Sequence, residues 1–224
     1  MHFFRHFHLL HFTLKRGLSE TYATIFLRSF ALSLVGLFVP IYLLKEIGIT
    51  FHDLLIYYIF VFLFFLVGYI VGAFLGAFLG TRRILIWSFP FYIAFYFLLD
   101  NLNNFNIPLI LLAIIIGIGE GIFWLAYNID FSLFSDKVHR GEEIKFWFVA
   151  ASLIGILGPF LGGFLLSFFN QRILFIIVII FLILAAFPLL KAKELRVEYS
   201  ISLKEIFRKE NFENSHRYFN QGFR

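Results

Sequence analysis

The sequence contains no cysteine, which excludes disulfide bridges, thiolate metal sites and cysteine nucleophiles. Charged residues are also scarce: they make up 15% of the 224 residues, whereas soluble domains carry about 25%. Apolar residues take their place, at 61% of the chain, and 35 of them are phenylalanine. A chain of this size has too little interior to hide so much apolar surface from water. The composition therefore excludes a soluble domain, a disordered chain and a secreted disulfide scaffold, and it predicts a polytopic membrane protein.

Motifs of common catalysts are missing as well. The sequence has no H-E-x-x-H, no G-x-S-x-G and no P-loop, so it indicates no zinc protease, serine hydrolase or ATP-hydrolysing site. Histidines alternate with phenylalanine and leucine near the N-terminus, but no further ligand completes a metal site there: His2, His6, His8 and His11. We expect no enzyme activity, no cofactor and no metal. The net charge of +5 is typical of cytoplasmic loops in a membrane protein, so we expect no nucleic-acid partner.

Six apolar stretches are long enough for membrane-spanning helices, which need roughly 20 residues. They cover about residues 22–44, 54–79, 84–99, 107–129, 146–169 and 173–190. These lengths favour helices over buried strands, and the short alternating segments of a membrane barrel are absent. Loop 100–106 is short and polar, whereas loop 130–145 is longer and charged. We predict an all-α protein with a basic N-terminal segment 1–21, a six-helix bundle 22–190 and a tail 191–224.

The distribution of lysine and arginine predicts the orientation. If the N-terminus is inside, 16 of the 19 basic residues fall in inner segments. The positive-inside rule then places both termini in the cytoplasm. In the tail, four apolar residues fall among charged ones: Ile201, Leu203, Ile206 and Phe207. This pattern is typical of an amphipathic helix that lies on the membrane or on another domain.

A short internal similarity suggests a repeat. Arg83-Ile84-Leu85 begins the third span, and Arg172-Ile173-Leu174 begins the sixth, 89 residues later. Each triplet follows a phenylalanine-rich span that contains glycine, and the separation is about half of the membrane portion. We therefore expect two three-helix repeats inserted with opposite topology, as in many secondary transporters.

A glycine-proline string lies in the fifth span after Gly155: Gly158-Pro159-Phe160-Leu161-Gly162-Gly163. Pro159 should kink the helix, and the glycines allow a neighbouring helix to approach closely. The string resembles the G-P-x-x-G-G motif in the fifth helix of the major facilitator superfamily of secondary transporters. The long first span with Arg28 and Pro40, the basic loop after the second span and the amphipathic tail also resemble that family's N-terminal half, over roughly residues 18–210.

The resemblance implies a transporter whose first and fourth helices line a central cavity between two rocking halves. Two departures qualify it. The family's loop after helix two commonly reads G-x-x-x-D-R-x-G-R-R/K, whereas this sequence keeps only glycines and a final basic pair: Gly76, Gly80, Arg82 and Arg83. A gating role for this loop therefore loses the ion pair made through the missing aspartate. The family also has twelve spans where this sequence has six, so it implies a fragment, or a partner that is a second six-helix half or a second copy in a homodimer.

Three ionisable residues fall within the spans, where such groups are costly and mark functional sites. Arg28 either extends to the lipid headgroups or pairs with a carboxylate that faces the bundle interior. Glu120 lies too deep to reach the headgroups, which fits proton coupling or a cation site, or else a protonated group bonded to a neighbouring helix. Asp130 lies at a depth similar to that of Arg28, so we hypothesise an Arg28–Asp130 pair. The alternative is an interfacial aspartate beside Ser132 and Ser135.

Residues around Glu120 are further candidates. By helical spacing Trp124 and Tyr127 share its face, next to Asn128, and this face either contacts substrate or packs against other helices. The glycines that flank Glu120 either allow close backbone approach or simply thin the helix. We interpret most of a further set of aromatics as membrane-interface residues: Tyr42, Tyr57, Tyr58, Tyr92 and Trp87.

Together these features predict secondary active transport of a small solute by a multi-pass protein of the plasma membrane. Its partners would be the lipid bilayer and a small-molecule solute. Two alternatives stay open at this point: a six-span membrane subunit that binds a ligand and passes it to a partner, and a non-transporting remnant. The substrate, the coupling ion and the direction of transport do not follow from the sequence.

Overall fold

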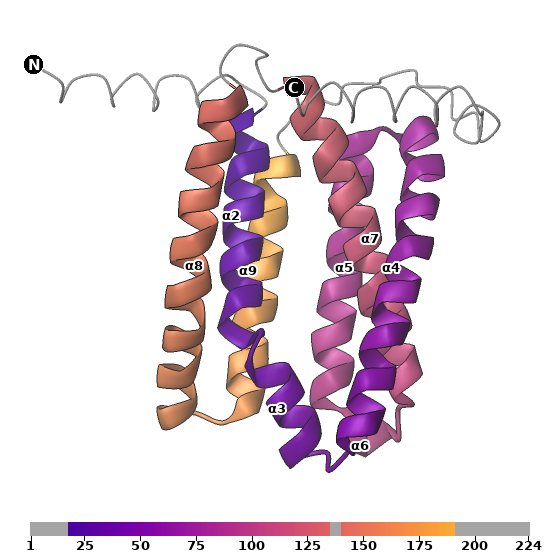
Figure 1. The fold of residues 1–224 in the computed structure, drawn as a ribbon, viewed down its shortest axis with the longest axis vertical. Coiled ribbons are helices and arrows are strands. Elements are labelled where there is room, and N and C mark those ends of the chain that lie inside the picture. The colour runs from indigo at the N-terminus through magenta and orange to yellow at the C-terminus, as the bar shows by residue number, and fades with distance from the viewer. Residues whose placement is uncertain (1–17, 135–139, 191–224) are drawn as a thin grey trace, which may run out of the picture.

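The computed structural model describes residues 18–134 and 140–190, and these ranges form helices with short connections (Figure 1). The helices are α2 (Leu18–Val35), α3 (Phe38–Lys45), α4 (Phe51–Leu79), α5 (Thr81–Asp100), α6 (Leu102–Phe105), α7 (Leu109–Phe134), α8 (Arg140–Phe168) and α9 (Gln171–Leu190). Within the described ranges, six segments are long and apolar enough to cross a membrane: Ser19–Lys45, Phe51–Leu79, Thr81–Asp100, Leu109–Ser132, Trp147–Phe168 and Gln171–Leu190. These segments overlap the six predicted spans in order, so the prediction of an all-α membrane architecture is confirmed.

The first span is interrupted, because α2 ends at Val35 and α3 begins at Phe38. Pro40 lies in the first turn of α3. Proline has no N–H to donate to the carbonyl four residues earlier, which here is the carbonyl of Gly36. Glycine also weakens a helix interior, so the break falls where both effects coincide.

The connections between helices are short. Gly80 alone joins α4 to α5, at a φ of +91° that only glycine adopts without strain. After α5, the predicted polar loop contains the single-turn helix α6. The connection predicted at 130–145 is partly helical, because α7 continues to Phe134 and α8 already begins at Arg140, while the candidate spans on either side end at Ser132 and begin at Trp147.

The helices pack in two groups, one of α2, α8 and α9 and the other of α4, α5 and α7 (Figure 1). In the first group α2 contacts both α8 and α9, and in the second α7 contacts both α4 and α5. Contacts of α5 with α9 and of α2 with α7 join the two groups. As a result α7 is the most enclosed span, and α4 and α8 are the most exposed.

The outward faces of α4 and α8 are apolar, with phenylalanines such as Phe62, Phe78 and Phe160 exposed. Such a surface would be a liability in water, and it suits contact with lipid. The start of α2 and the end of α9 lie at the same end of the bundle (Figure 1). The predicted tail helix, and the predicted N-terminal segment up to residue 17, lie outside the described residues.

Candidate functional site

A buried ion pair joins α2 to the middle of α7. Arg28 Nη2 lies 2.6 Å from Glu120 Oε2. The side chain of Arg28 is only 3% exposed, whereas that of Glu120 is 23% exposed. The interpretation that Arg28 extends to the headgroups is therefore wrong. The other interpretation, a carboxylate partner in the bundle interior, is confirmed, with Glu120 as the partner.

Aromatic side chains enclose the rest of the Arg28 guanidinium. Its Nη2 also donates a 2.5 Å hydrogen bond to the hydroxyl of Tyr92 on α5. The guanidinium carbon lies 3.7 Å from the ring centroid of Phe123, 4.7 Å from that of Tyr92 and 5.7 Å from that of Trp124, all within cation–π range. Among the described residues no acceptor takes the buried Nε–H of Arg28. Three rings and one carboxylate thus hold this cation inside the bundle.

Two of these residues were not identified by the sequence. Tyr92 was interpreted as an interface aromatic, but it is fully buried and bonds Arg28. Phe123 is also fully buried, and nothing distinguishes it from the other phenylalanines of the chain. A signal for Tyr92 exists in retrospect, because a buried tyrosine hydroxyl needs a polar partner and Arg28 is one of few available.

The glycines around Glu120 explain why it points towards α2. A Cβ on Gly121 or Gly117 would collide with the backbone of α4, and a Cβ on Gly119 would lie 2.6 Å from the Cβ of Phe91 on α5. These positions therefore let α4 and α5 approach α7 closely from two sides. Of the two interpretations of these glycines, close approach of neighbouring helices is the one that holds. The side that remains for Glu120 is the side of α2.

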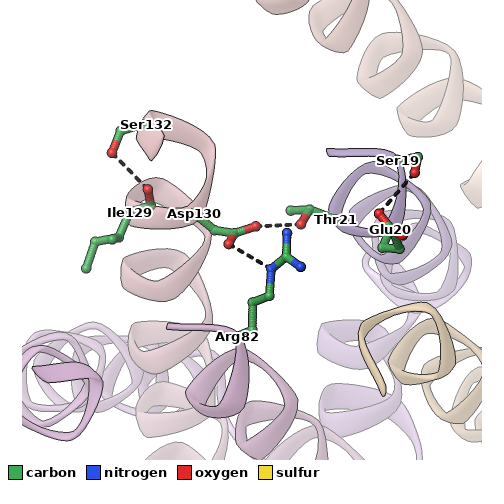
Figure 2. A network of polar contacts seen from close by, with 7 residues as sticks. All are labelled: Ser19, Glu20, Thr21, Arg82, Ile129, Asp130 and Ser132. Carbon is green, nitrogen blue, oxygen red and sulfur yellow. Dashed lines mark hydrogen bonds and ion pairs between the residues drawn. The ribbon is translucent and has the colours of Figure 1, made fainter. Parts of the chain in front are cut away.

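A second buried pair lies near the ends of the helices, between Arg82 and Asp130 (Figure 2). Arg82 Nε donates to Asp130 Oδ1 at 3.2 Å, and Thr21 Oγ1 donates to Asp130 Oδ2 at 2.5 Å (Figure 2). The side chains of Arg82 and Asp130 are 3% and 1% exposed. This network ties α2, α5 and α7 together through one carboxylate, and no feature of the sequence indicated the part played by Thr21.

The hypothesised Arg28–Asp130 pair is wrong. Asp130 lies level with Thr21, and Arg28 is seven residues further along α2. A helix rises about 1.5 Å per residue, so Arg28 lies about 10 Å deeper than Thr21. Two ion pairs do form across the bundle, but Arg28 pairs with Glu120, and Arg82 pairs with Asp130.

The residues predicted to share one face of α7 lie on two sides of the helix. Tyr127 turns into the core, where its ring stacks on Phe123 with centroids 6.3 Å apart. Glu120 and Trp124 are partly exposed, and Asn128 is exposed. These last three residues, spaced four apart along one side of α7, form what we call the open stripe.

The predicted loop between the second and third spans is compact. The Gly80 N–H donates to the carbonyl of Gly76, which is buried in the last turn of α4. Arg82 follows directly in the first turn of α5 and reaches Asp130, whereas Arg83 is exposed. Of the predicted loop residues, Arg82 is thus the one that the fold brings to Asp130.

The glycine string of α8 packs against α2. A Cβ on Gly158 would collide with the side chain of Ser33, and a Cβ on Gly162 would collide with the carbonyl of Leu34. By contrast, a Cβ on Gly163 would lie at an ordinary contact distance from its nearest neighbour, and a Cβ on Gly155 would have no atom within 4 Å. Close helix packing is therefore the role of Gly158 and Gly162, and α8 continues through Pro159 to Phe168.

Comparison with known proteins gives one family. No curated protein matches the chain. Residues 21–213 match the Major Facilitator Superfamily, and the matched range includes all six candidate spans except the first two residues of the first one. With most of its length matched and with six membrane-length helices, the chain belongs to the Major Facilitator Superfamily of membrane transporters.

Proposed function

We propose that this protein moves a small solute across the membrane by secondary active transport, with alternating access to a site beside the Arg28–Glu120 pair. That pair is the observation that carries the proposal. Ionisable groups deep in a membrane protein are costly, and they most often mark a solute or ion pathway. Arg28 and Glu120 lie near the middle of facing helices, and Glu120 is part of the open stripe. We assign substrate or coupling-ion contacts to Glu120, Trp124 and Asn128, with Tyr127 behind them.

The packing supports two inverted three-helix repeats. Let α2 with α3, α4 and α5 form the first unit, and α7, α8 and α9 the second. The contact of α4 with α7 then corresponds to that of α8 with α2, and the contact of α5 with α7 corresponds to that of α9 with α2. Glycines spaced four apart mediate both outer contacts, Gly68 and Gly72 on α4 and Gly158 and Gly162 on α8. Because each unit has three spans, the second would enter the membrane in the opposite direction.

We assign a gating role to the Arg82–Asp130 pair with Thr21. The three residues come from three different helices, so movement of α2 relative to α7 would break the network. The charge distribution supports a cytoplasmic position for this end of the bundle, because the segments that join there carry the most lysine and arginine. A network at that end would hold the cytoplasmic side of the transport pathway in one of the two states of the alternating-access cycle.

The proposal includes a location and a partner. The uneven distribution of basic residues supports cytoplasmic termini, and we propose the plasma membrane as the site of action. A cavity between two halves needs a second wall, so we propose a second six-helix half or a second copy of this chain as the partner. Lipid would cover the remaining apolar faces of α4 and α8.

The test is solute-dependent proton movement in liposomes that contain the purified protein and a trapped pH-sensitive dye. Solutes are added one class at a time, and we expect one class to change the internal pH. Glu120→Gln should abolish that change. The matched control is Asp100→Asn, which removes a carboxylate from the exposed pair with Arg172 and should leave transport intact.

Two outcomes would contradict the proposal. If Glu120→Gln leaves both solute uptake and its pH dependence unchanged, Glu120 has no coupling role. If a solute binds to the protein but no solute crosses the membrane, the chain is a ligand-binding subunit and not a transporter by itself.

A further inference from the structure

The charge balance at Arg28 depends on a single group. Arginine keeps its charge at every physiological pH. Among the described residues, one carboxylate contacts Arg28, that of Glu120, and the other neighbours are the neutral rings of Tyr92, Phe123 and Trp124. A buried cation without a counter-charge is strongly destabilising. If Glu120 becomes neutral, another anion must therefore balance the charge of Arg28.

The pair is also arranged so that an anion could replace Glu120. Of its two members Glu120 is the more exposed one, and it belongs to the open stripe. The guanidinium already has one buried N–H, at Nε, without an acceptor among the described residues. Release of Glu120 would free a second N–H, at Nη2. Two adjacent donors on a guanidinium form the fork that binds a carboxylate or sulfonate group.

We infer that the solute of the proposed transport site is a small organic monoanion with an apolar or aromatic body, and that it binds together with one proton. The proton enters on Glu120 and the anion binds Arg28. This inference rests on the proposed function, since it names the substrate class of the same site.

The charges balance only for that combination. Before binding, the site holds Arg28 as a cation and Glu120 as an anion. After binding it holds Arg28 as a cation, the solute as an anion and a neutral Glu120, so the site is neutral again. A proton alone would leave Arg28 unbalanced, and an anion alone would leave two negative groups around one cation. The two ligands must therefore favour each other's binding, and the linkage is reciprocal.

Other classes of solute fit less well. An organic cation on Glu120 would have to displace Arg28, which leaves two positive charges next to one carboxylate. A neutral solute would leave the pair in place and would bind without a proton. The apolar body is assigned from the rings near the guanidinium, because Phe123 and Trp124 lie against it and Trp124 continues onto the open stripe.

The titratable groups around the pair lie on α2, α4 and α5. The groups that face the pair are Arg28 from α2 and the hydroxyls of Tyr92 and Tyr96 from α5. Tyr58 on α4 lies near Tyr96, and the charged residues of α4, His52 and Asp53, lie at its far end. A tyrosine hydroxyl is a far weaker acid than a carboxyl and arginine keeps its charge, so we assign the linkage between anion and proton binding to Glu120.

The experiment measures binding to the full chain in lipid nanodiscs with three probes of one shape. Benzenesulfonate is a permanent monoanion, benzyltrimethylammonium is a permanent cation, and benzenesulfonamide is a neutral control. Calorimetry in mildly acidic and mildly alkaline buffers gives the affinities, and buffers of different ionisation enthalpy give the number of protons taken up. Since no probe changes charge over this range, any pH dependence belongs to the protein.

We expect benzenesulfonate to bind about tenfold or more tightly in acidic buffer, within the range of typical coupling, and to take up about one proton in alkaline buffer. Glu120→Gln mimics the protonated carboxyl, so it should keep the binding of benzenesulfonate and lose both the pH dependence and the proton uptake. Arg28→Lys keeps the charge without the fork and should bind more weakly. Asp100→Asn, on the exposed pair with Arg172, should behave as the unmodified protein.

Several results would overturn the inference. These are binding of the cation in preference to the anion, anion binding that does not depend on pH, a pH dependence that survives in Glu120→Gln, or no anion binding by protein that circular dichroism shows to be folded. Failure of the proposed function is a separate result. If benzenesulfonate binds with a proton and never crosses a liposome membrane, the inference stands and transport fails. If another solute crosses and benzenesulfonate does not bind, transport stands and the inference fails.

Discussion

In the α4–α7 crossing, glycines come from both helices, whereas in the α2–α8 crossing they come from α8 alone. Gly68 of α4 meets the backbone of Ile118, and Gly121 of α7 meets the backbone of α4. On the other side of the bundle, Gly158 meets mainly the side chain of Ser33. At Gly162, however, the nearest atom is the backbone carbonyl oxygen of Leu34, so both crossings bring backbones into direct contact, and the second also has a side chain between the helices at Gly158. Glycines spaced four apart therefore meet different neighbours in the two crossings.

The crossings also differ in what they support. The α4–α7 crossing lies directly behind Glu120, between Gly117 and Gly121. It fixes the helix that carries both buried carboxylates, those of Glu120 and Asp130. The α2–α8 crossing supports the helix that carries Arg28. The two crossings therefore position the two helices of the Arg28–Glu120 pair.

The largest effect is expected from Gly121→Ala, which would break the α4–α7 crossing. The new Cβ would lie 2.5 Å from the backbone N of Tyr69 and 2.8 Å from the backbone C of Gly68, and neither atom can turn away. Overpacking typically costs about 1–3 kcal/mol, and we expect a loss at the upper end of this range or above it. Thermal unfolding in detergent, followed by circular dichroism, measures the loss. An unchanged melting temperature would mean that α4 and α7 separate freely.

A smaller loss, about 1–2 kcal/mol, is expected from Gly158→Ala in the α2–α8 crossing. Its Cβ would collide with the Oγ and Cβ of Ser33 and would lie 2.8 Å from the backbone C of that residue. Ser33→Gly in the same chain should recover part of the loss, with a coupling of about 0.5–3 kcal/mol in a double-mutant cycle of unfolding free energies. If the effects of the two substitutions on the unfolding free energy are additive, the side chain of Ser33 does not limit how closely α2 and α8 approach each other.

Removal of the exposed pair between Asp100 and Arg172 should cost at most about 1 kcal/mol, because surface ion pairs contribute little. These residues join α5 to α9 at 2.9 Å, where no glycine crossing exists, and Arg172 is 61% exposed. Asp100→Asn and Arg172→Gln should lower the melting temperature slightly and equally, and high salt should remove the difference. A loss as large as that of Gly121→Ala would show that this end of the bundle is held by charge and not by packing.

The smallest effect is expected from Gly155→Ala, within about 0.5 kcal/mol of the unmodified protein. Gly155 lies on the same helix as Gly158, but no atom lies within 4 Å of its Cβ position. It is therefore the matched control for the two glycine substitutions above, measured by the same unfolding experiment. A clear loss here would mean that a partner outside this chain packs against α8.

The spans could be predicted because they depend on local composition. Each is a run of apolar residues bounded by charge, turn residues or glycine, and the structure follows these runs closely. The predicted helix ends were less accurate at residues 130–145. The charged residues there indicated a loop, but α7 and α8 extend into this segment from both sides. A charged segment that leaves the membrane keeps its helical hydrogen bonds in water, so hydropathy does not mark where the helix stops.

The polar partners could not be predicted in the same way. Arg28, Glu120 and Asp130 were identified by their cost in a membrane, yet the pairing chosen between Arg28 and Asp130 was wrong. Their depths along separate helices depend on tilt and on the break in the first span, which sequence spacing does not give. Tyr92 was assigned to the membrane interface, because a tyrosine in an apolar helix is found there more often than beside an arginine.

The sequence by itself determined the membrane character, the six helices, the family and the identity of Arg28, Glu120 and Asp130 as charged residues within the spans, because each follows from residue type and local order. The tertiary structure decided which charges pair, which glycines pack and which side of α7 stays open. Those features depend on how far one helix is shifted and rotated against its neighbour. A shift of one turn, about 5.4 Å, exchanges one ion-pair partner for another without changing the hydropathy of any span.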